Sequence, residues 1–110
     1  PLRRGMMATV YADLLPCPDP SERLPVYRRA YEDEWFVRVL PPGRLPDTRQ
    51  VACTNFADLS VHHDARTGKV KVLCAIDNLG KGAAAQAVQA INLMAGLPEN
   101  EGLANAGNAI

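Results

Sequence analysis

The sequence predicts an α+β domain with a mixed or mostly antiparallel sheet and two helices. The 110 residues are 47% hydrophobic and 22% charged, which is typical of one globular domain with a modest core. Period-two and helical patterns follow one another in the order strand, helix, three strands, helix, which favours an α+β arrangement. No GxGxxG turn follows a strand, so a Rossmann fold is a poor match.

The first half of the chain predicts a helix with one strand before it and one strand after it. Gly5–Leu15 is rich in residues that suit a pleated surface, and Pro16 ends it. Ser21–Asp33 has apolar residues at helical spacing, with Ser21 as the N-cap and Pro25 tolerated in the first turn. Trp35–Leu40 is predicted to be a second, short strand.

The second half predicts a long strand, a hairpin and the main helix. Gln50–Asp64 alternates with a period of two, and Arg66–Lys69 has the composition of a hairpin turn into a strand over Val70–Ile76. Lys81–Ala95 is predicted to be a helix, because apolar residues recur along one stripe and Gly96 follows as the C-cap. The members of the stripe are Ala84, Val88, Ile91 and Ala95, widened by Ala87 and Met94.

Charge and cysteine content argue against several classes of function. Twelve basic and twelve acidic residues balance, so there is no electrostatic footprint for nucleic acid or an anionic membrane. No apolar run approaches the roughly 20 residues that span a bilayer. Cys17, Cys53 and Cys74 lie far apart with no CxxC spacing, which argues against a disulfide scaffold and against a zinc site. We therefore expect a reducing, cytoplasmic setting and no metal.

No residue is assigned to catalysis. Cys74 lies in the middle of a strand, and Cys17 and Cys53 have no base near them in the sequence. His62 and His63 are neighbours on a predicted strand, so their side chains point to opposite faces and cannot chelate one metal together.

The junction from Asp77 to Gln89 is the most informative segment. It connects the predicted strand Val70–Ile76 to the main helix through a polar turn that contains Gly80 and Gly82. Such a turn presents unpaired backbone N–H groups and the positive end of the helix dipole, which suit a phosphate or a carboxylate.

Three blocks of residues carry a resemblance to a known family. These are Arg4-Gly5-Met6 with Ala8–Tyr11, the spaced residues Phe36, Pro46, Thr48, Val51 and Asn55, and the run Asp77–Gln89 followed by Asn92-Leu93-Met94, Gly96–Glu99 and Gly102-Leu103. Together they resemble the N-acetyl-gamma-glutamyl-phosphate reductase family, within the semialdehyde dehydrogenase superfamily. Cys53-Thr54 replace the family's usual Gly-Ser, and Ala85 replaces a frequent glycine.

The resemblance implies an NADP-dependent reductase of arginine biosynthesis that converts an acyl phosphate to a semialdehyde. The family's cysteine nucleophile, acid–base histidine and cofactor turn belong to motifs that are absent here. The resemblance therefore implies that the chain is a C-terminal part of such an enzyme, inactive without the N-terminal part. Residues 1–76 would belong to the substrate and dimerisation domain, and residues 77–110 would form a helix and tail that pack toward the cofactor domain. A homo-oligomer is expected.

The resemblance also implies the site residues. Asn78 would contact the nicotinamide side of NADP, and Lys81 and Gly82 would hold the junction near the cofactor; N-capping by Asp77 or Asn78 is the alternative. Arg4 would bind a carboxylate or phosphate of the substrate, and a structural ion pair is its alternative.

Two further readings of the whole chain stay open. A non-catalytic interaction or assembly module could retain the same fold. The related lysine-pathway reductase, which acts on a carrier-linked aminoadipyl substrate, would carry the same motifs.

Overall fold

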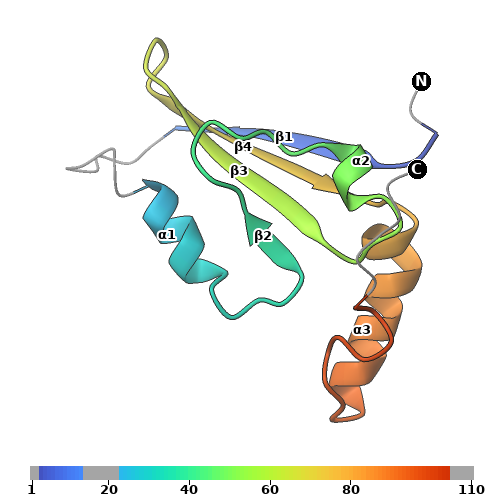
Figure 1. The fold of residues 1–110 in the computed structure, drawn as a ribbon. Coiled ribbons are helices and arrows are strands. Elements are labelled where there is room, and N and C mark those ends of the chain that lie inside the picture. Colours follow the sequence, from blue (N-terminus) through green and yellow to red (C-terminus); the bar gives the residue numbers. More distant parts are fainter. Residues whose placement is uncertain (1–2, 14–22, 105–110) are drawn as a thin grey trace.

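Four strands form one mixed sheet, as the sequence predicts. The computed structural model describes residues 3–13 and 23–104. Its strands are β1 (Met6–Ala12), β2 (Val37–Val39), β3 (Ala57–Asp64) and β4 (Lys69–Ile76), in the spatial order β1-β4-β3-β2 (Figure 1). β4 pairs antiparallel with both β1 and β3, whereas β2 runs parallel to β3. The α+β class and the mostly antiparallel sheet are confirmed.

The β3–β4 hairpin is the centre of the sheet. Its register runs from Ala57 opposite Ile76 to Asp64 opposite Lys69, and Gly68 takes a left-handed φ of 71° in the turn between them. Next to that turn, the carboxylate of Asp64 forms an ion pair with Nζ of Lys71 at 2.8 Å. The predicted hairpin is therefore confirmed.

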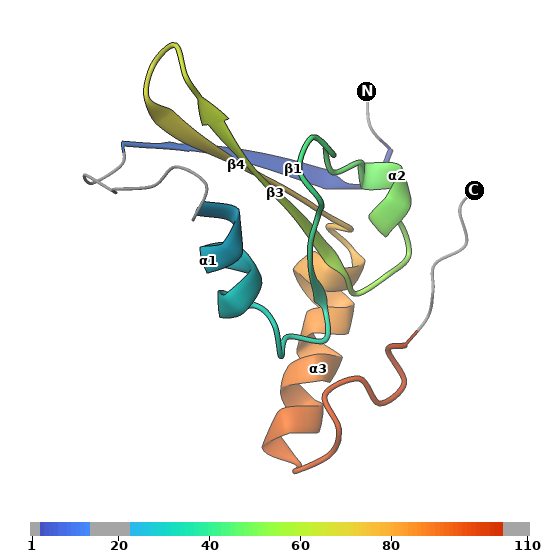
Figure 2. The ribbon, with the colours of Figure 1, turned by 60° about the vertical axis from the view of Figure 1, so that its left-hand side comes forward.

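In the described part of the chain three helices accompany the sheet, one more than predicted. They are α1 (Arg23–Ala30), α2 (Thr48–Val51) and α3 (Ala85–Met94), with a π-helical segment over Gly80–Ala84 that leads into α3. In Figures 1 and 2, α1 lies near the hairpin end of the sheet, and α3 projects away from the opposite end, where β4 finishes. Within the described ranges no helix is long and apolar enough to cross a membrane.

The predicted strand over Gln50–Asp64 is wrong in its first half. Asp47 accepts a hydrogen bond from the backbone N–H of Arg49 and so caps α2, which occupies Thr48–Val51. Cys53 then takes a φ of 60°, which no strand residue adopts. The alternation of Val51, Cys53 and Asn55 therefore reflects a short helix and a turn. The remaining predictions at Ser21, Leu14 and Leu15 and at the prolines 16, 18 and 20 lie outside the described residues.

The interior is small and unusually polar. Among residues 3–13 and 23–104, five hydrophobic residues are buried, namely Phe36, Val51, Ala57, Val70 and Ala75. Asn55, Asp58, Ser60 and Asp77 are at most 2% exposed, so polar side chains fill much of the remaining interior. Buried polar groups are stable only when they are paired. Asp58 pairs with Arg38 and Asn55 with Gln89, whereas Asp77 is paired at the strand–helix junction that follows β4.

The apolar stripe predicted for the main helix does not face the interior of this chain. Val88, Ile91 and Met94 are 41%, 61% and 88% exposed, whereas Gln89 and Asn92 are buried. Asn92 donates from Nδ2 to the carbonyl oxygens of Glu99 (3.2 Å) and Glu101 (3.0 Å), which ties the tail to the helix. The polar side of α3 therefore packs against its own chain, and its apolar side stays open.

Candidate functional site

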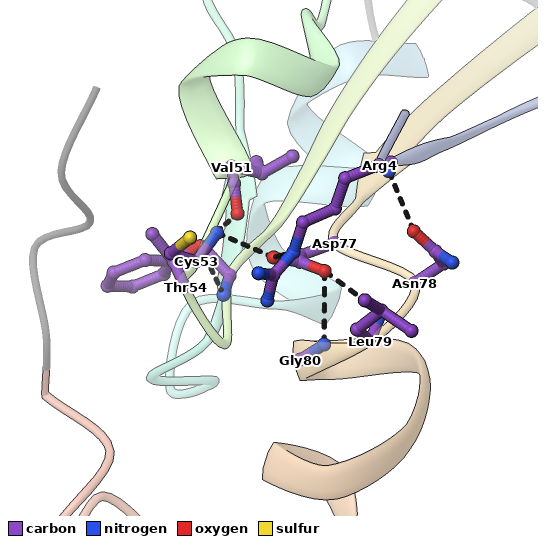
Figure 3. A network of polar contacts seen from close by, with 10 residues as sticks. Arg4, Val51, Cys53, Thr54, Asp77, Asn78, Leu79 and Gly80 are labelled. Carbon is purple, nitrogen blue, oxygen red and sulfur yellow. Dashed lines mark hydrogen bonds and ion pairs between the residues drawn. The ribbon is translucent and has the colours of Figure 1, made fainter. Parts of the chain in front are cut away.

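Asp77 is the centre of the junction and lies directly after β4. Its side chain is fully buried. Oδ1 accepts hydrogen bonds from the backbone N–H groups of Leu79 (2.9 Å) and Gly80 (3.1 Å), and Oδ2 accepts from that of Cys53 at 2.5 Å. The same Oδ2 lies 2.6 Å from Nε of Arg4 (Figure 3). One carboxylate thus joins the segment before β1, the turn after α2 and the beginning of the helix.

The electrostatics of Asp77 follow from these contacts. Burial raises the pKa of this carboxyl, but the ion pair with Arg4 and the three backbone N–H donors outweigh burial and hold its pKa at about 2. Asp77 in turn raises the pKa of the Arg4 guanidinium. Both groups are therefore charged at neutral pH. Asp77, which the sequence analysis considered only as a helix cap, is the anchor of the whole site.

Of the two roles that the sequence left open for Arg4, the structure shows the ion pair. Arg4 makes this ion pair through Nε, yet its side chain is still 38% exposed. Among the residues that the structure describes, no partner is found for its two terminal nitrogens. Arg4 is thus held in place and keeps donors available for a ligand.

Asn78 does not cap the helix, because Asp77 accepts those N–H groups. The Oδ1 of Asn78 instead accepts a hydrogen bond from the backbone N–H of Gly5 at 2.7 Å and ties the beginning of β1 to the junction (Figure 3). The residue is exposed, and its Nδ2 has no partner within the described ranges. Asn78 can therefore still donate to a bound group.

Lys81 and Gly82 are neighbours in the sequence but have different environments. Lys81 donates from Nζ to Oε1 of Gln89 at 2.8 Å and lies over the ring of Phe36 at 5.5 Å. Burial lowers the pKa of Lys81, while the carboxylates of Glu99 and Glu34 act in the opposite direction. Gly82 is exposed. Lys81 therefore belongs to a polar cluster inside the chain, and Gly82 lies on the surface.

Gly80, which the sequence analysis did not assign to the site, lies too close to the backbone of Thr54 to carry a side chain. A Cβ at this position would lie 2.7 Å from the carbonyl oxygen of Thr54, a distance that real Cβ atoms do not reach. A Cβ at Gly82 would make only ordinary contacts, the nearest at 3.4 Å. The close approach of two backbone segments at Gly80 lets the Asp77 carboxylate reach both. Sequence spacing alone could not distinguish the two glycines.

A cavity of about 320 Å³ opens beside this network. It is lined by Arg4, Cys53, Thr54, Asn55 and Gly80, and on its other side by the C-terminal segment, including Leu103. The cavity brings together one predicted site residue, Arg4, with residues that the sequence analysis did not assign to the site. Lys81, Asn78 and Gly82 are not among its lining residues.

Cys53 lines this cavity, and its backbone is strained. Its φ of 60° is in the left-handed region that favours glycine, at the position where the resembled family has Gly. Cys53 is exposed and Cys74 is half-buried; burial raises the pKa of the Cys74 thiol. Within residues 3–13 and 23–104, no three His, Cys, Asp or Glu side chains come together as metal ligands.

Comparison with known proteins agrees with this architecture. The family model described as "Semialdehyde dehydrogenase, dimerisation domain" matches residues 1–78. The N-acetyl-gamma-glutamyl-phosphate reductase of Acetivibrio thermocellus is 50% identical over 107 residues, which are 97% of this chain and 31% of that protein. The protein of the same name from Desulforudis audaxviator is 54% identical over 103 residues, 94% of this chain and 30% of its own length. The chain spans about a third of these relatives. By the family match the chain belongs to the semialdehyde dehydrogenases, whose dimerisation domain it contains, and the relatives it resembles at about 50% identity are N-acetyl-gamma-glutamyl-phosphate reductases.

Proposed function

We propose that this chain is the C-terminal portion of an NADP-dependent N-acetyl-gamma-glutamyl-phosphate reductase. Such an enzyme reduces an acyl phosphate to a semialdehyde in arginine biosynthesis. Relatives of that name match nearly the whole chain, yet the chain spans only 31% of the length of one of them. We assign residues 1–76 to the substrate and dimerisation domain, and residues 77–110 to a helix and tail that pack toward the cofactor domain of a cytoplasmic enzyme.

The observation that carries this proposal is the cavity at the strand–helix junction. Arg4 lines it and has terminal nitrogens that no described residue occupies. A guanidinium fork can hold a carboxylate or phosphate with two parallel hydrogen bonds. Arg4 is therefore assigned to binding an oxyanion of the acyl phosphate substrate.

The cofactor NADP would supply the hydride when it is bound. Asn78 fits a place at its edge, because the exposed amide still has Nδ2 to donate. Gly82 fits as an exposed backbone position of the same turn. Lys81 fits only as a support, because its ammonium is already bound to Gln89.

Among the residues that the structure describes, no cysteine has the surroundings of an activated nucleophile. Cys53 lines the cavity, but no histidine or other base lines it as well. The raised pKa of Cys74 keeps that thiol protonated at neutral pH. Catalysis therefore depends on a cysteine and a histidine from the N-terminal part of the enzyme, and the isolated chain is expected to be inactive.

The open apolar side of α3 supports a domain partner. Val88, Ile91, Leu93 and Met94 are all at least 41% exposed, next to the junction that would contact the cofactor. An exposed row of apolar side chains is typical of a surface that another domain covers. β1 is also exposed along its whole length, which fits further contacts in a homo-oligomer.

Reconstitution tests the proposal. The part of the Acetivibrio thermocellus reductase that this chain does not match is produced separately and mixed with the chain. We expect NADPH oxidation with N-acetyl-gamma-glutamyl phosphate only when both parts are present. Arg4→Lys should raise KM, whereas Arg49→Lys, in a surface pair with Asp47, should not.

The other outcomes separate the alternatives. Turnover by the 110-residue chain alone would contradict the absence of a nucleophile. Association without turnover would favour a non-catalytic assembly module. Turnover only with a carrier-linked aminoadipyl phosphate would favour the lysine-pathway reductase.

A further inference from the structure

Arg4 and Asp77 form an ion pair beside the cavity, but only the Arg4 side chain is accessible to a ligand. The Asp77 side chain is fully buried, so its carboxylate cannot itself meet a ligand. The Arg4 side chain is 38% exposed and lines the cavity. Arg4 reaches from the segment before β1 across the junction and gives its Nε to Asp77 (Figure 3). Because a guanidinium is a rigid planar fork, fixing Nε also fixes the two terminal nitrogens.

Asp77 also fixes two other parts of the cavity wall. Its Oδ2 binds the backbone N–H of Cys53, and its Oδ1 binds that of Gly80. Cys53 and Gly80 line the same cavity as Arg4. Three wall residues from three distant segments therefore depend on one carboxylate.

We propose that Asp77 is a positioning residue, which holds Arg4 by Nε so that its terminal nitrogens are preorganised for a ligand oxyanion in the cavity. This inference rests on the binding role proposed for Arg4. The ligand chemistry is a carboxylate or a phosphate, because both match the spacing of two guanidinium N–H groups. The charges of Arg4 and Asp77 cancel, so binding depends on hydrogen-bond geometry more than on net charge.

The first test replaces Asp77 with an isosteric amide. The isotopically labelled chain is titrated with inorganic phosphate and, separately, with propionate, and binding is followed by the NMR signals of the Arg4 Nε–H and the Gly80 amide. In Asp77→Asn one acceptor oxygen is replaced by an NH2 group, so the remaining oxygen cannot serve both Nε of Arg4 and the N–H groups of Leu79 and Gly80, and the hold on Arg4 weakens. We expect affinity to fall by about two- to twelvefold, the range that corresponds to ordering one long side chain.

The chain contains a matched control. Nε of Arg38 lies 2.6 Å from Oδ1 of Asp58, whose side chain is 1% exposed. Asp58→Asn therefore removes a buried aspartate from another arginine–aspartate pair, one that does not line the cavity. We expect it to leave the affinity for both probes unchanged. If Asp77 served only to neutralise Arg4, Asp77→Asn would instead bind the anions more tightly, and that result would overturn the proposal.

A second variant keeps the proposal testable if Asp77→Asn does not fold. Lysine has one ammonium group, so Arg4→Lys can pair with Asp77 or hold an oxyanion but cannot use two edges as arginine does. We expect Arg4→Lys to fold normally and to lose probe binding. Wild-type affinity in Arg4→Lys, or no binding of either probe to the wild-type chain, would refute the inference.

The two probes and the reconstituted enzyme separate this inference from the proposed function. A stronger response to phosphate than to propionate would assign the site to a phosphoryl group, and the reverse to a carboxylate. Asp77-dependent binding without reductase activity on reconstitution would leave the positioning role intact and reject the proposed reaction. Reductase activity on reconstitution, together with unchanged probe affinity in Asp77→Asn, would support the proposed reaction and reject the positioning role.

Discussion

Replacement of Asp77 by asparagine should destabilise the fold in a pH-dependent way. The folded-state pKa of Asp77 is about 2, against an ordinary value of 3.8. At 1.36 kcal/mol per pH unit, this depression corresponds to about 2 kcal/mol of the free energy of unfolding. Because the folded-state pKa is depressed, this stabilisation is complete above the unfolded-state value and disappears as the pH falls from about 4 to about 2.

The assay is urea denaturation of the wild-type chain and Asp77→Asn at a series of pH values from 7 to 3, followed by circular dichroism. The other carboxylates titrate equally in both proteins, so the difference between them isolates Asp77. We expect a difference of about 2 kcal/mol at pH 7 that shrinks steadily below pH 4. Asp47→Asn serves as the control, because the carboxylate of Asp47 pairs with Arg49 at the surface and should contribute little. A difference that stays constant with pH, or that is absent at pH 7, would refute this reasoning.

Three further changes test the backbone of the site. Cys53→Gly should raise the free energy of unfolding by about 1 kcal/mol by relieving a left-handed residue, whereas Cys53→Ala should not; equal midpoints in urea for the two variants would argue against strain. Gly80→Ala should cost about 1–3 kcal/mol because its Cβ would collide with a backbone carbonyl, while Gly82→Ala should be neutral or stabilising in the same urea titration. If both alanine variants are equally stable, the close approach does not constrain the fold. Asn92→Ala should increase hydrogen exchange over residues 99–104, because it releases two carbonyl groups of the tail, and the exposed Gln86→Ala should not; unchanged exchange would show that the tail is held by other contacts.

Local patterns predicted the elements that depend on neighbouring residues. The hairpin around Gly68 and the helix after the junction were predictable, since turn glycines and helical spacing act over a few residues. The strand over Gln50–Asp64 failed in its first half, because Asp47 caps a helix of only four residues and Cys53 adopts a conformation that its side chain does not favour. A period of two could not distinguish this arrangement from a strand.

The site itself was only partly predictable. The junction and Arg4 were identified from the residues and the resemblance, but the ion pair between Arg4 and Asp77 joins residues that are 73 positions apart, and spacing gives no signal at that range. The sequence of this chain also could not predict which side of α3 faces the interior. The apolar stripe of this helix was found correctly, yet which side meets the interior depends on Gln89 and Asn92 having partners within the chain.

Arg4 and the backbone of Cys53 both bind the carboxylate of Asp77, and this has a consequence for folding. A partly assembled chain, in which β1 has not yet joined β4 or the turn after α2 has not yet closed, contains no binding cavity. The cavity beside Arg4, Cys53 and Gly80 therefore has its complete wall only when these segments have come together on Asp77. Ligand affinity would consequently report on whether the final long-range contacts of the polypeptide have formed.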